Sequence, residues 1–173
     1  MKRLLLMRHA KTENWYQGTD DEGRALVPRG WDDARLMSEA LLKRKWAPDK
    51  VIMSTARRTR ETWKAMSEAM PGVNSTVLEE LYLISPDALL TLISDQWQDA
   101  DTLLVIGHNP GLQELTSRLA DNHQMSDDEA SRSVGSKMPA CATALFEYDS
   151  DAEVLEQSLI LRDFIIAKDL RRV

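Results

Sequence analysis

The sequence predicts an α/β protein built as three layers, α/β/α, around a mainly parallel central sheet. Along the 173 residues, short apolar segments alternate with longer amphipathic ones. Strands that alternate with helices pair in parallel, and their helices cover both faces of the sheet. Three of the apolar segments end abruptly in polar side chains, and ligands of such sheets bind beyond the carboxyl ends of the strands.

Continuous apolar runs predict the strands, because the strands of a parallel sheet are buried on both faces. The predicted strands are Leu4–Met7, Lys50–Met53 and Leu103–Ile106, with Val77–Leu78 as a weaker candidate. Apolar residues at helical spacing predict the helices between them. The predicted helices are Trp31–Trp46, Thr59–Met70, Pro86–Trp97 and Gly111–Ala120.

The C-terminal third departs from this alternation. The segments ATALFEYD (142–149) and LEQSLILRDF (155–164) predict two consecutive strands that pair as a hairpin at one edge of the sheet. Before this hairpin, Asp121–Pro139 is polar and lacks periodicity, which is typical of a long loop or a lid. Gly18–Gly30 is a second, turn-rich loop. We expect one domain over residues 1–173.

The composition excludes several classes of protein. Hydrophobic residues make up 43% of the chain, which excludes wholesale disorder. With 22 Lys and Arg against 28 Asp and Glu the net charge is −6, so no overall positive field attracts nucleic acid or an anionic membrane. We therefore expect neither as a partner, and a bound anion requires a local group of positive side chains.

Two features bear on where the protein works. Cys141 is the single cysteine and cannot form an internal disulfide, which favours a reducing compartment. The first apolar run, Leu4–Met7, is interrupted by Arg8, whereas a secretory segment needs about 7–15 apolar residues. We therefore expect a cytoplasmic protein. We also expect it to be a monomer.

Polar side chains follow three of the predicted strands. They are Arg8 and His9 after the first, Ser54 after the second, and His108 and Asn109 after the third. The segment directly after Ser54 is rich in arginine and contains Arg57, Arg58 and Arg60. If these strands are parallel neighbours, two imidazoles and several guanidinium groups meet at one sheet edge. This combination predicts a site for an oxyanion, most simply a phosphate.

Phosphoryl transfer requires such side chains for a physical reason. Negative charge spreads over the equatorial oxygens of the transferred group, and positioned positive donors stabilise it. Arginine stays charged and binds two oxygens at once through its planar fork. A neutral imidazole can attack phosphorus to form phosphohistidine, which water then hydrolyses. Surrounding positive charge lowers the pKa of that imidazole and keeps it neutral at about pH 7.

Simpler interpretations stay open for each residue. A histidine at a strand end is often structural, and Arg57–Arg60 can be an exposed helix face. His9 and His108 can also ligate a metal ion, but no HExxH motif or cysteine pair accompanies them, and neighbouring arginines repel a cation. We therefore expect no metal and no other cofactor.

Several segments, in order along the chain, resemble motifs of the histidine phosphatase superfamily, which has the phosphoglycerate-mutase-like fold. LLLMRHAKT resembles its Arg-His-Gly/Ala signature, STARRTRET its Ser-x-x-x-Arg-x-x-x-Thr block, and LLVIGHNPGLQEL the block with a second histidine. LVPRG is similar to the Leu-Thr-x-x-Gly that opens the first long helix, with Val27 in place of threonine. MPACATALFEY and FIIAKDL resemble the end of the compact branch typified by the phosphohistidine phosphatase SixA.

The resemblance implies a role for each matching residue. His9 would be the nucleophile that becomes phosphorylated, and Arg8, Arg58 and His108 would complete the phosphate pocket. Larger members of the superfamily use a glutamate to protonate the leaving group, and Glu80 stands in a similar Leu-x-Glu setting. SixA-like proteins often manage without this acid.

The resemblance therefore implies a metal-independent phosphatase that works through a phosphohistidine intermediate, with phosphohistidine in proteins as its substrate. A chain of 173 residues has little material to roof the pocket, so we expect an open site that suits a protein surface. A phosphatase of small molecules, such as a sugar phosphate or a nucleotide, is the first alternative. A phosphate-binding module without turnover is the second. The expected partner is thus a phosphorylated protein or a small phosphorylated molecule.

Overall fold

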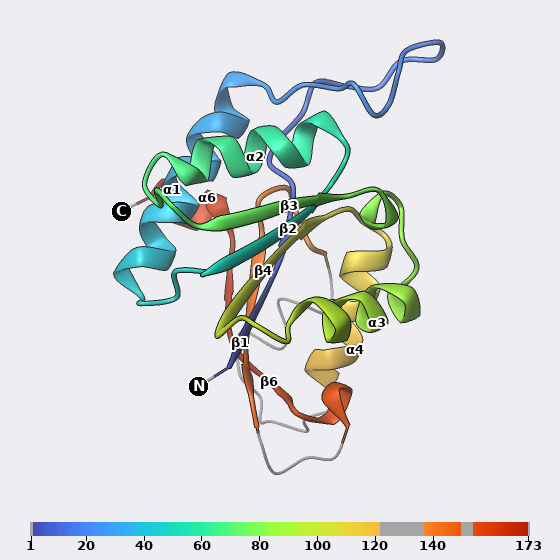
Figure 1. Ribbon diagram of the computed structural model, residues 1–173. Coiled ribbons are helices and arrows are strands. Elements are labelled where there is room, and N and C mark those ends of the chain that lie inside the picture. The colour runs from blue at the N-terminus through green and yellow to red at the C-terminus, as the bar shows by residue number, and fades with distance from the viewer. Residues whose placement is uncertain (1, 122–136, 150–153, 173) are drawn as a thin grey trace.

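The computed structural model describes residues 2–121, 137–149 and 154–172, and its centre is a six-stranded sheet (Figure 1). The order of the strands across the sheet is β3-β2-β4-β1-β5-β6. They are β1 (Arg3–Arg8), β2 (Lys50–Ser54), β3 (Asn74–Leu78), β4 (Thr102–Gly107), β5 (Thr143–Tyr148) and β6 (Leu159–Ile165). The first four strands pair in parallel, whereas β5 is antiparallel to both β1 and β6.

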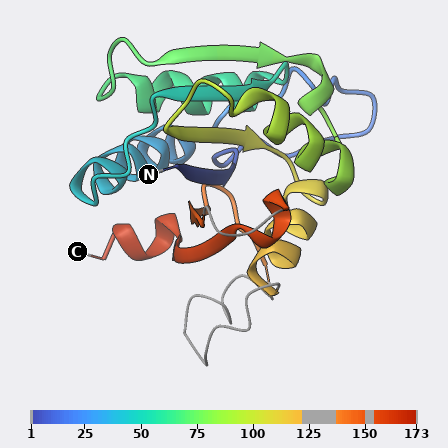
Figure 2. The same ribbon diagram turned by 60° about the horizontal axis from the view of Figure 1, so that its bottom comes forward.

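Helices cover both faces of the sheet, which confirms the predicted three-layer α/β/α arrangement (Figures 1 and 2). The helices are α1 (Pro28–Lys43), α2 (Arg57–Ser67), α3 (Pro86–Gln96), α4 (Gly111–Asp121) and the short α6 (Ala167–Leu170). Two 3-10 turns are η1 (Glu79–Leu81) and η2 (Leu155–Gln157). Helices α1, α2 and α6 lie against one face, and α3 and α4 lie against the other.

Strand β1 shows how the sheet is buried on both sides. Leu4 and Leu6 belong to the core beneath α3 and α4, while Leu5 and Met7 belong to the core beneath α1 and α2. All four side chains are completely buried, and successive side chains of a strand point to opposite faces. Burial on both faces explains the continuous apolar run that predicted this strand.

The predicted strands and helices are all present, with shifts at their ends. Helix α1 begins at Pro28 rather than Trp31, because proline fits the first turn of a helix. Strand β3 begins at Asn74, before the predicted Val77–Leu78. It is an edge strand whose side chains are mostly exposed, so its first residues carry no apolar signal. Strands β5 and β6 form the predicted hairpin, with β6 at the other edge.

The chain directly after β1 is held against the start of α1. The carbonyl oxygen of Lys11 accepts a hydrogen bond from the backbone N–H of Val27 (3.0 Å). A Cβ atom at Gly30 would lie 2.2 Å from the same oxygen, so only glycine permits this approach. The contact fixes the residues that follow His9 in the sequence.

Two further features concern the predicted loop before β5 and the possibility of a membrane-spanning helix. Of the predicted loop or lid Asp121–Pro139, residues 122–136 lie outside the described residues. Over residues 2–121, 137–149 and 154–172, no helix is both long and apolar enough to cross a membrane.

Candidate active site

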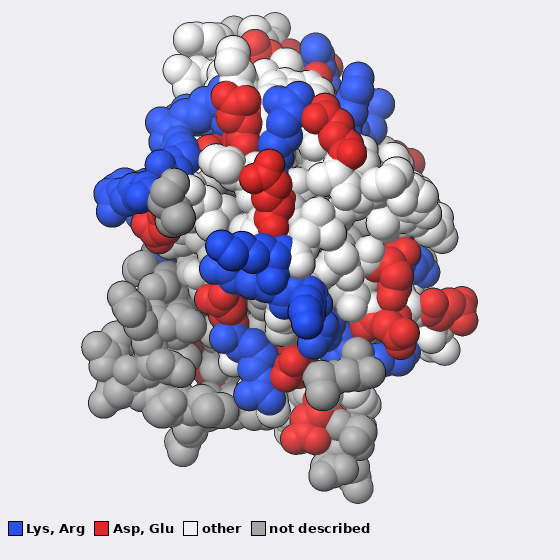
Figure 3. Space-filling model, turned by 90° about the vertical axis from the view of Figure 1, so that its left-hand side faces the viewer, with Lys and Arg blue, Asp and Glu red and all other residues white. Residues whose placement is uncertain are grey.

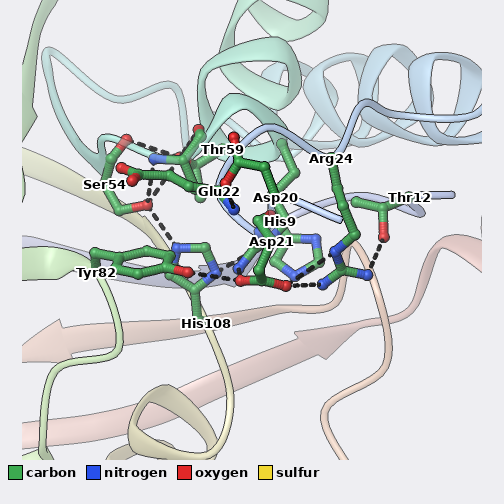
Figure 4. Close-up of polar contacts among 12 residues, drawn as sticks. His9, Thr12, Asp20, Asp21, Glu22, Arg24, Ser54, Thr59, Tyr82 and His108 are labelled. Atoms are coloured by element: carbon green, nitrogen blue, oxygen red, sulfur yellow. Dashed lines mark hydrogen bonds and ion pairs between the residues drawn. The ribbon is translucent and has the colours of Figure 1, made fainter. Parts of the chain in front are cut away.

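His9 and His108 follow neighbouring strands and lie close together at the carboxyl end of the sheet (Figure 4). Strands β1 and β4 pair in parallel with Arg8 opposite Gly107, and the next residue of each chain segment is a histidine. The centroids of the two rings are 5.4 Å apart. Both residues are almost fully buried, with 7% of His9 and 5% of His108 exposed. The structure thus brings together the two histidines that end apolar runs in the sequence.

Of the three arginines after β2, Arg58 reaches the histidines. It is 2% exposed, and its Nε donates a hydrogen bond to Nδ1 of His108 (3.2 Å). Arg57 pairs instead with Glu61 on the same helix, at 2.7 Å, and Arg60 is exposed. Neighbouring positions of a helix face different directions, so only one member of the run turns toward the sheet edge.

A hydrogen bond fixes which nitrogen of His9 carries the proton. Nδ1 of His9 lies 2.8 Å from the carbonyl oxygen of Ala10. A carbonyl oxygen only accepts hydrogen bonds, so Nδ1 of the neutral ring carries the hydrogen. The lone pair of the neutral ring is therefore on Nε2, the atom from which a histidine can attack phosphorus.

A chain of hydrogen bonds orients the ring of His108. Nδ1 accepts from Arg58, so Nε2 of the neutral ring carries the hydrogen and donates it to Oγ of Ser54 at 2.5 Å. Oγ of Ser54 lies 3.0 Å from Oγ1 of Thr59, which donates to the carbonyl of Ala56 (2.8 Å). Because the carbonyl of Ala56 can only accept, Thr59 donates to it, Ser54 donates to Thr59, and Nε2 of His108 donates to Ser54. These hydrogen bonds fix the tautomer of His108.

Burial is the main reason that both histidines have a low pKa. Burial lowers the pKa of His9 to about 3. The hydrogen bond to the carbonyl of Ala10 raises this pKa, whereas the nearby positive groups lower it further. Burial, followed by the charge of Arg58, lowers the pKa of His108 to about 3, while Asp21 opposes this shift. Both rings are therefore neutral near pH 7 in the free protein.

Arg8 brings a second guanidinium group to the site from the end of β1. Its Nη1 donates to the carbonyl of Met138 (3.0 Å), which holds the side chain against the segment before β5. Burial, followed by the charges of Arg58 and Arg24, lowers the pKa of Arg8. Its Nε is buried and has no hydrogen-bond partner among the described residues. A buried donor without a partner, beside other positive charges, suits a bound anion.

The carboxylate of Asp21 lies over the same guanidinium group that contacts His108. Its Oδ2 accepts hydrogen bonds from Nη2 of Arg58 (3.2 Å) and from the hydroxyl of Tyr82 (2.6 Å). Its Oδ1 accepts from Nε of Arg24 (3.0 Å). Burial raises the pKa of Asp21, but the hydrogen bond from Tyr82 and the two arginines outweigh it and hold the pKa below its usual value. Asp21 is therefore an ionised carboxylate that contacts two guanidinium groups and a tyrosine hydroxyl.

Glu80, the predicted acid, is exposed on η1. Its side chain forms no hydrogen bond or ion pair with any described residue. Tyr82, two residues further on, extends into the site, where its ring meets His108 edge-on with centroids 5.5 Å apart. The structure therefore brings four of the five predicted residues together and leaves Glu80 at the surface nearby.

Sequence reasoning missed Asp21, Arg24 and Tyr82. The loop Gly18–Gly30 has no apolar pattern, and Asp21 meets Tyr82 across 61 positions of sequence. The available signal was chemical: an acidic run followed closely by Arg24, within a long turn-rich loop next to the first strand end. Such loops often carry functional side chains.

The arrangement suits the binding of a tetrahedral oxyanion beside an imidazole with a free lone pair. The guanidinium of Arg58 contacts His108, and the charge of Arg8 acts on both imidazoles. Such donors stabilise charge on transferring phosphoryl oxygens. In the part of the chain that the structure describes, no group of three His, Cys, Asp or Glu side chains is placed to hold a metal ion.

Comparisons with known proteins give the family. The sequence profile of the histidine phosphatase superfamily (branch 1) matches residues 4–85, which include His9 and Arg58. An uncharacterized protein of Mycobacterium tuberculosis strain H37Rv is 32% identical over 141 residues, covering 80% of this chain and 85% of that protein. An uncharacterized chloroplastic protein of Arabidopsis thaliana is 31% identical over 69% of this chain, and the chain spans 59% of its length. The chain belongs to the histidine phosphatase superfamily.

The fold is similar to solved structures of SixA proteins. A candidate phosphohistidine phosphatase SixA from Nakamurella multipartita is 26% identical with a TM-score of 0.80, and 95% of each chain is covered. Its counterpart from Agrobacterium tumefaciens is 25% identical with a TM-score of 0.77, covering 95% of this chain and 97% of that one. A candidate alpha-ribazole-5'-P phosphatase from Escherichia coli shares the fold at 15% identity and a TM-score of 0.65, with 96% and 97% covered. The fold is therefore SixA-like and phosphoglycerate-mutase-like.

Proposed function

We propose that this protein is a metal-independent phosphatase that forms a phosphohistidine intermediate on His9 and acts on phosphohistidine in proteins. The observation that carries the proposal is the hydrogen bond between Nδ1 of His9 and the carbonyl of Ala10 (2.8 Å). It leaves the Nε2 lone pair free, and the low pKa of His9 keeps that lone pair unprotonated.

The reaction has two steps. Nε2 of His9 attacks phosphorus, a P–N bond forms, and the bond from phosphorus to the leaving group breaks. The leaving group takes up a proton and departs. Water then attacks the phosphohistidine, the P–N bond breaks, and inorganic phosphate leaves as His9 returns to its starting form.

Arg8, Arg58 and His108 would hold the transferred oxygens. The unpartnered Nε of Arg8 supplies one donor, and Arg58 supplies a planar fork. Phosphate bears the opposite charge to an imidazolium, so its binding raises the pKa of His108. Protonation of Nδ1 would replace the hydrogen bond that this atom accepts from Arg58 with one that it donates to a phosphate oxygen. The hydrogen-bond chain through Ser54 keeps this ring aligned.

The proton for the leaving group distinguishes substrate types. An imidazole leaving group bound through a labile P–N bond needs less help than an alkoxide. We assign Glu80 as the acid for phosphate esters from its Leu-x-Glu setting; its side chain is exposed on η1. The exposed position of Glu80 agrees with a phosphohistidine substrate, because its imidazole leaving group needs little protonation.

The chemistry is tested by hydrolysis in EDTA of a phosphohistidine peptide and of p-nitrophenyl phosphate. We expect the wild type to clear both, and His9→Ala to clear neither and to form no acid-labile phosphoenzyme. Arg58→Ala should lose most activity, whereas Arg57→Ala, which changes the exposed neighbouring arginine, should keep it.

The outcomes separate the alternatives. Cleavage of the ester alone, through His9, would keep the mechanism and assign the enzyme to small molecules. Activity of His9→Ala within a few-fold of wild type would refute the mechanism. If the wild type were inert toward both substrates, the protein would be a phosphate-binding module.

A further inference from the structure

A hollow lies at the same end of the sheet as the histidines, beside β5 and β6. Its walls are the chain after β1, the start of α1, the segment before β5, and the end of β6 with α6. Its volume is about 520 Å³. We call it the basic hollow, and its charged side chains are Lys11, Arg29, Asp33, Lys137, Lys168 and Arg171.

The basic hollow gathers five cationic side chains around one carboxylate, in a chain whose net charge is −6. The carboxylate belongs to Asp33, which is 4% exposed. Its Oδ1 lies 3.4 Å from Nη1 of Arg171, and its Oδ2 lies 3.9 Å from Nε of Arg29. Asp33 is therefore shared by two arginines and cannot neutralise the remaining cations.

The three lysines of the basic hollow have no counter-ion within the described chain. Lys11, Lys137 and Lys168 are exposed, and none forms a side-chain hydrogen bond or ion pair with a described residue. Like charges that converge without a counter-ion repel one another, so folding stability gives no reason for this grouping. An anion bound from outside would remove the repulsion.

Positive charge is local on the face of the molecule that carries α1. Figure 3 views the side that carries α1 and the C-terminal end, where groups of blue Lys and Arg side chains are separated by red carboxylates. A nucleic-acid surface requires an extended basic face or stripe, which this mixture does not provide. The basic hollow is suited to a few neighbouring anionic groups rather than to an extended polyanion.

The hollow and the candidate active site share two segments of chain. Lys11 stands two residues after His9, and Lys137 precedes the residue whose carbonyl oxygen binds Arg8. The backbone N–H of Cys141 donates to the carbonyl of His9 (3.0 Å), so the segment before β5 lies directly against the histidine. The hollow therefore lies beside the two chain segments that adjoin His9.

We propose that the basic hollow binds acidic side chains of the phosphorylated protein whose phosphohistidine enters the pocket at His9. Lysines are flexible point charges that accommodate several carboxylates, whereas a dedicated phosphate site favours the rigid fork of arginine. The volume also exceeds the needs of one phosphate group. The identity of this partner rests on the function proposed above, whereas the binding of an acidic chain does not.

The test reverses two charges of the hollow and leaves the histidine site unchanged. The variant is Lys137→Glu with Lys168→Glu. The matched control is Lys43→Glu with Lys64→Glu, which makes the same change in charge at exposed positions on α1 and α2 outside the hollow. The probes are a fluorescent glutamate-rich peptide without phosphate, measured by anisotropy, and phosphohistidine peptides with acidic or neutral flanking residues, measured by hydrolysis.

We expect the hollow variant to bind the glutamate-rich peptide about tenfold more weakly than the control, with a smaller dependence on salt. It should raise KM for the acidic phosphohistidine peptide and leave kcat and the cleavage of p-nitrophenyl phosphate unchanged. Lys137→Gln with Lys168→Gln should also weaken peptide binding and raise KM, but by smaller factors, because it removes the two charges without reversing them.

Equal binding of the acidic peptide by the hollow variant and the control would overturn the proposal. Tighter binding of an oligonucleotide or of tripolyphosphate than of the peptide, lost in the same variant, would overturn the choice of an acidic protein. If the peptide binds through the hollow but no phosphohistidine peptide is cleaved, the proposed substrate fails and the acidic docking site stands.

Discussion

The carboxylate of Asp21 accepts a hydrogen bond from the guanidinium of Arg58, with Oδ2 lying 3.2 Å from Nη2. The same guanidinium donates to His108 through Nε and to the backbone carbonyl of Asp21 through Nη1. In the free protein Asp21 therefore takes positions on Arg58 that a phosphate oxygen would otherwise use. If phosphate binds Arg58 as proposed, it must compete with the Asp21 carboxylate for the same guanidinium group.

This competition predicts that Asp21→Asn binds phosphate more tightly than the wild type. The amide is similar in shape to the carboxylate but carries no charge to repel the anion, so the inhibition constant of inorganic phosphate should fall about threefold to tenfold. Inhibition of p-nitrophenyl phosphate hydrolysis measures it. Asp20→Asn, which changes the neighbouring carboxylate, is the matched control. Weaker phosphate binding by Asp21→Asn would mean that Asp21 orients Arg58 rather than competing with phosphate.

A second prediction concerns the hydrogen bond from Nε2 of His108 to Ser54. Ser54→Ala removes the acceptor and leaves a buried N–H without a partner, so kcat/KM should fall about tenfold. The ring of His108 should also lose its single tautomer, which nitrogen chemical shifts of the imidazole report. Ser67→Ala on the exposed part of α2 provides the control. An unchanged tautomer and rate would show that Arg58 alone holds the ring.

The low pKa values of the two histidines predict an acid-sensitive fold. Unfolded histidine has a pKa of about 6.5 and folded His9 and His108 have values of about 3, so the unfolded state binds more protons between these limits. Stability is therefore fully present above pH 6.5 and is lost as pH falls toward 3. Each imidazole should cost about 2 kcal/mol of unfolding free energy between pH 7 and pH 5, before most carboxylates titrate.

Urea unfolding at pH 7, 6 and 5 measures this dependence. His9→Asn should remove about half of the slope, because one of the two buried imidazoles is gone. A wild-type stability that is flat over this range would show that the buried histidines do not resist protonation.

Glu80→Gln tests the leaving-group acid. If Glu80 protonates an alkoxide or phenoxide, the substitution should slow ester cleavage about tenfold or more and slow phosphoramidate cleavage much less, since general acid catalysis contributes at least that much where it operates. Rates on a phosphate monoester and on a phosphohistidine peptide compare the two. Glu79→Gln changes the adjacent exposed carboxylate as a control. Equal effects on both substrates would remove the assigned role.

The layers of the fold and the sheet end that carries the two histidines can be inferred from the sequence alone. Leu4–Met7 and Leu103–Ile106 are apolar throughout because both faces of their strands are buried, and this is visible without coordinates. The ends of these runs identify His9 and His108, which the structure places 5.4 Å apart between ring centroids. Strand β3 was the weakest prediction, because an exposed edge strand lacks the apolar signal.

The side chains that surround the histidines could be identified only from the three-dimensional arrangement of the elements. Asp21, Arg58 and Tyr82 come from a loop, a helix and the chain after η1, and their contacts span 37 and 61 positions of sequence. The basic hollow likewise joins Lys11 to Lys168, which no local pattern connects. Periodicity in a sequence records burial along one element. Contacts between polar side chains of different elements depend on how those elements pack, and that packing is decided in three dimensions.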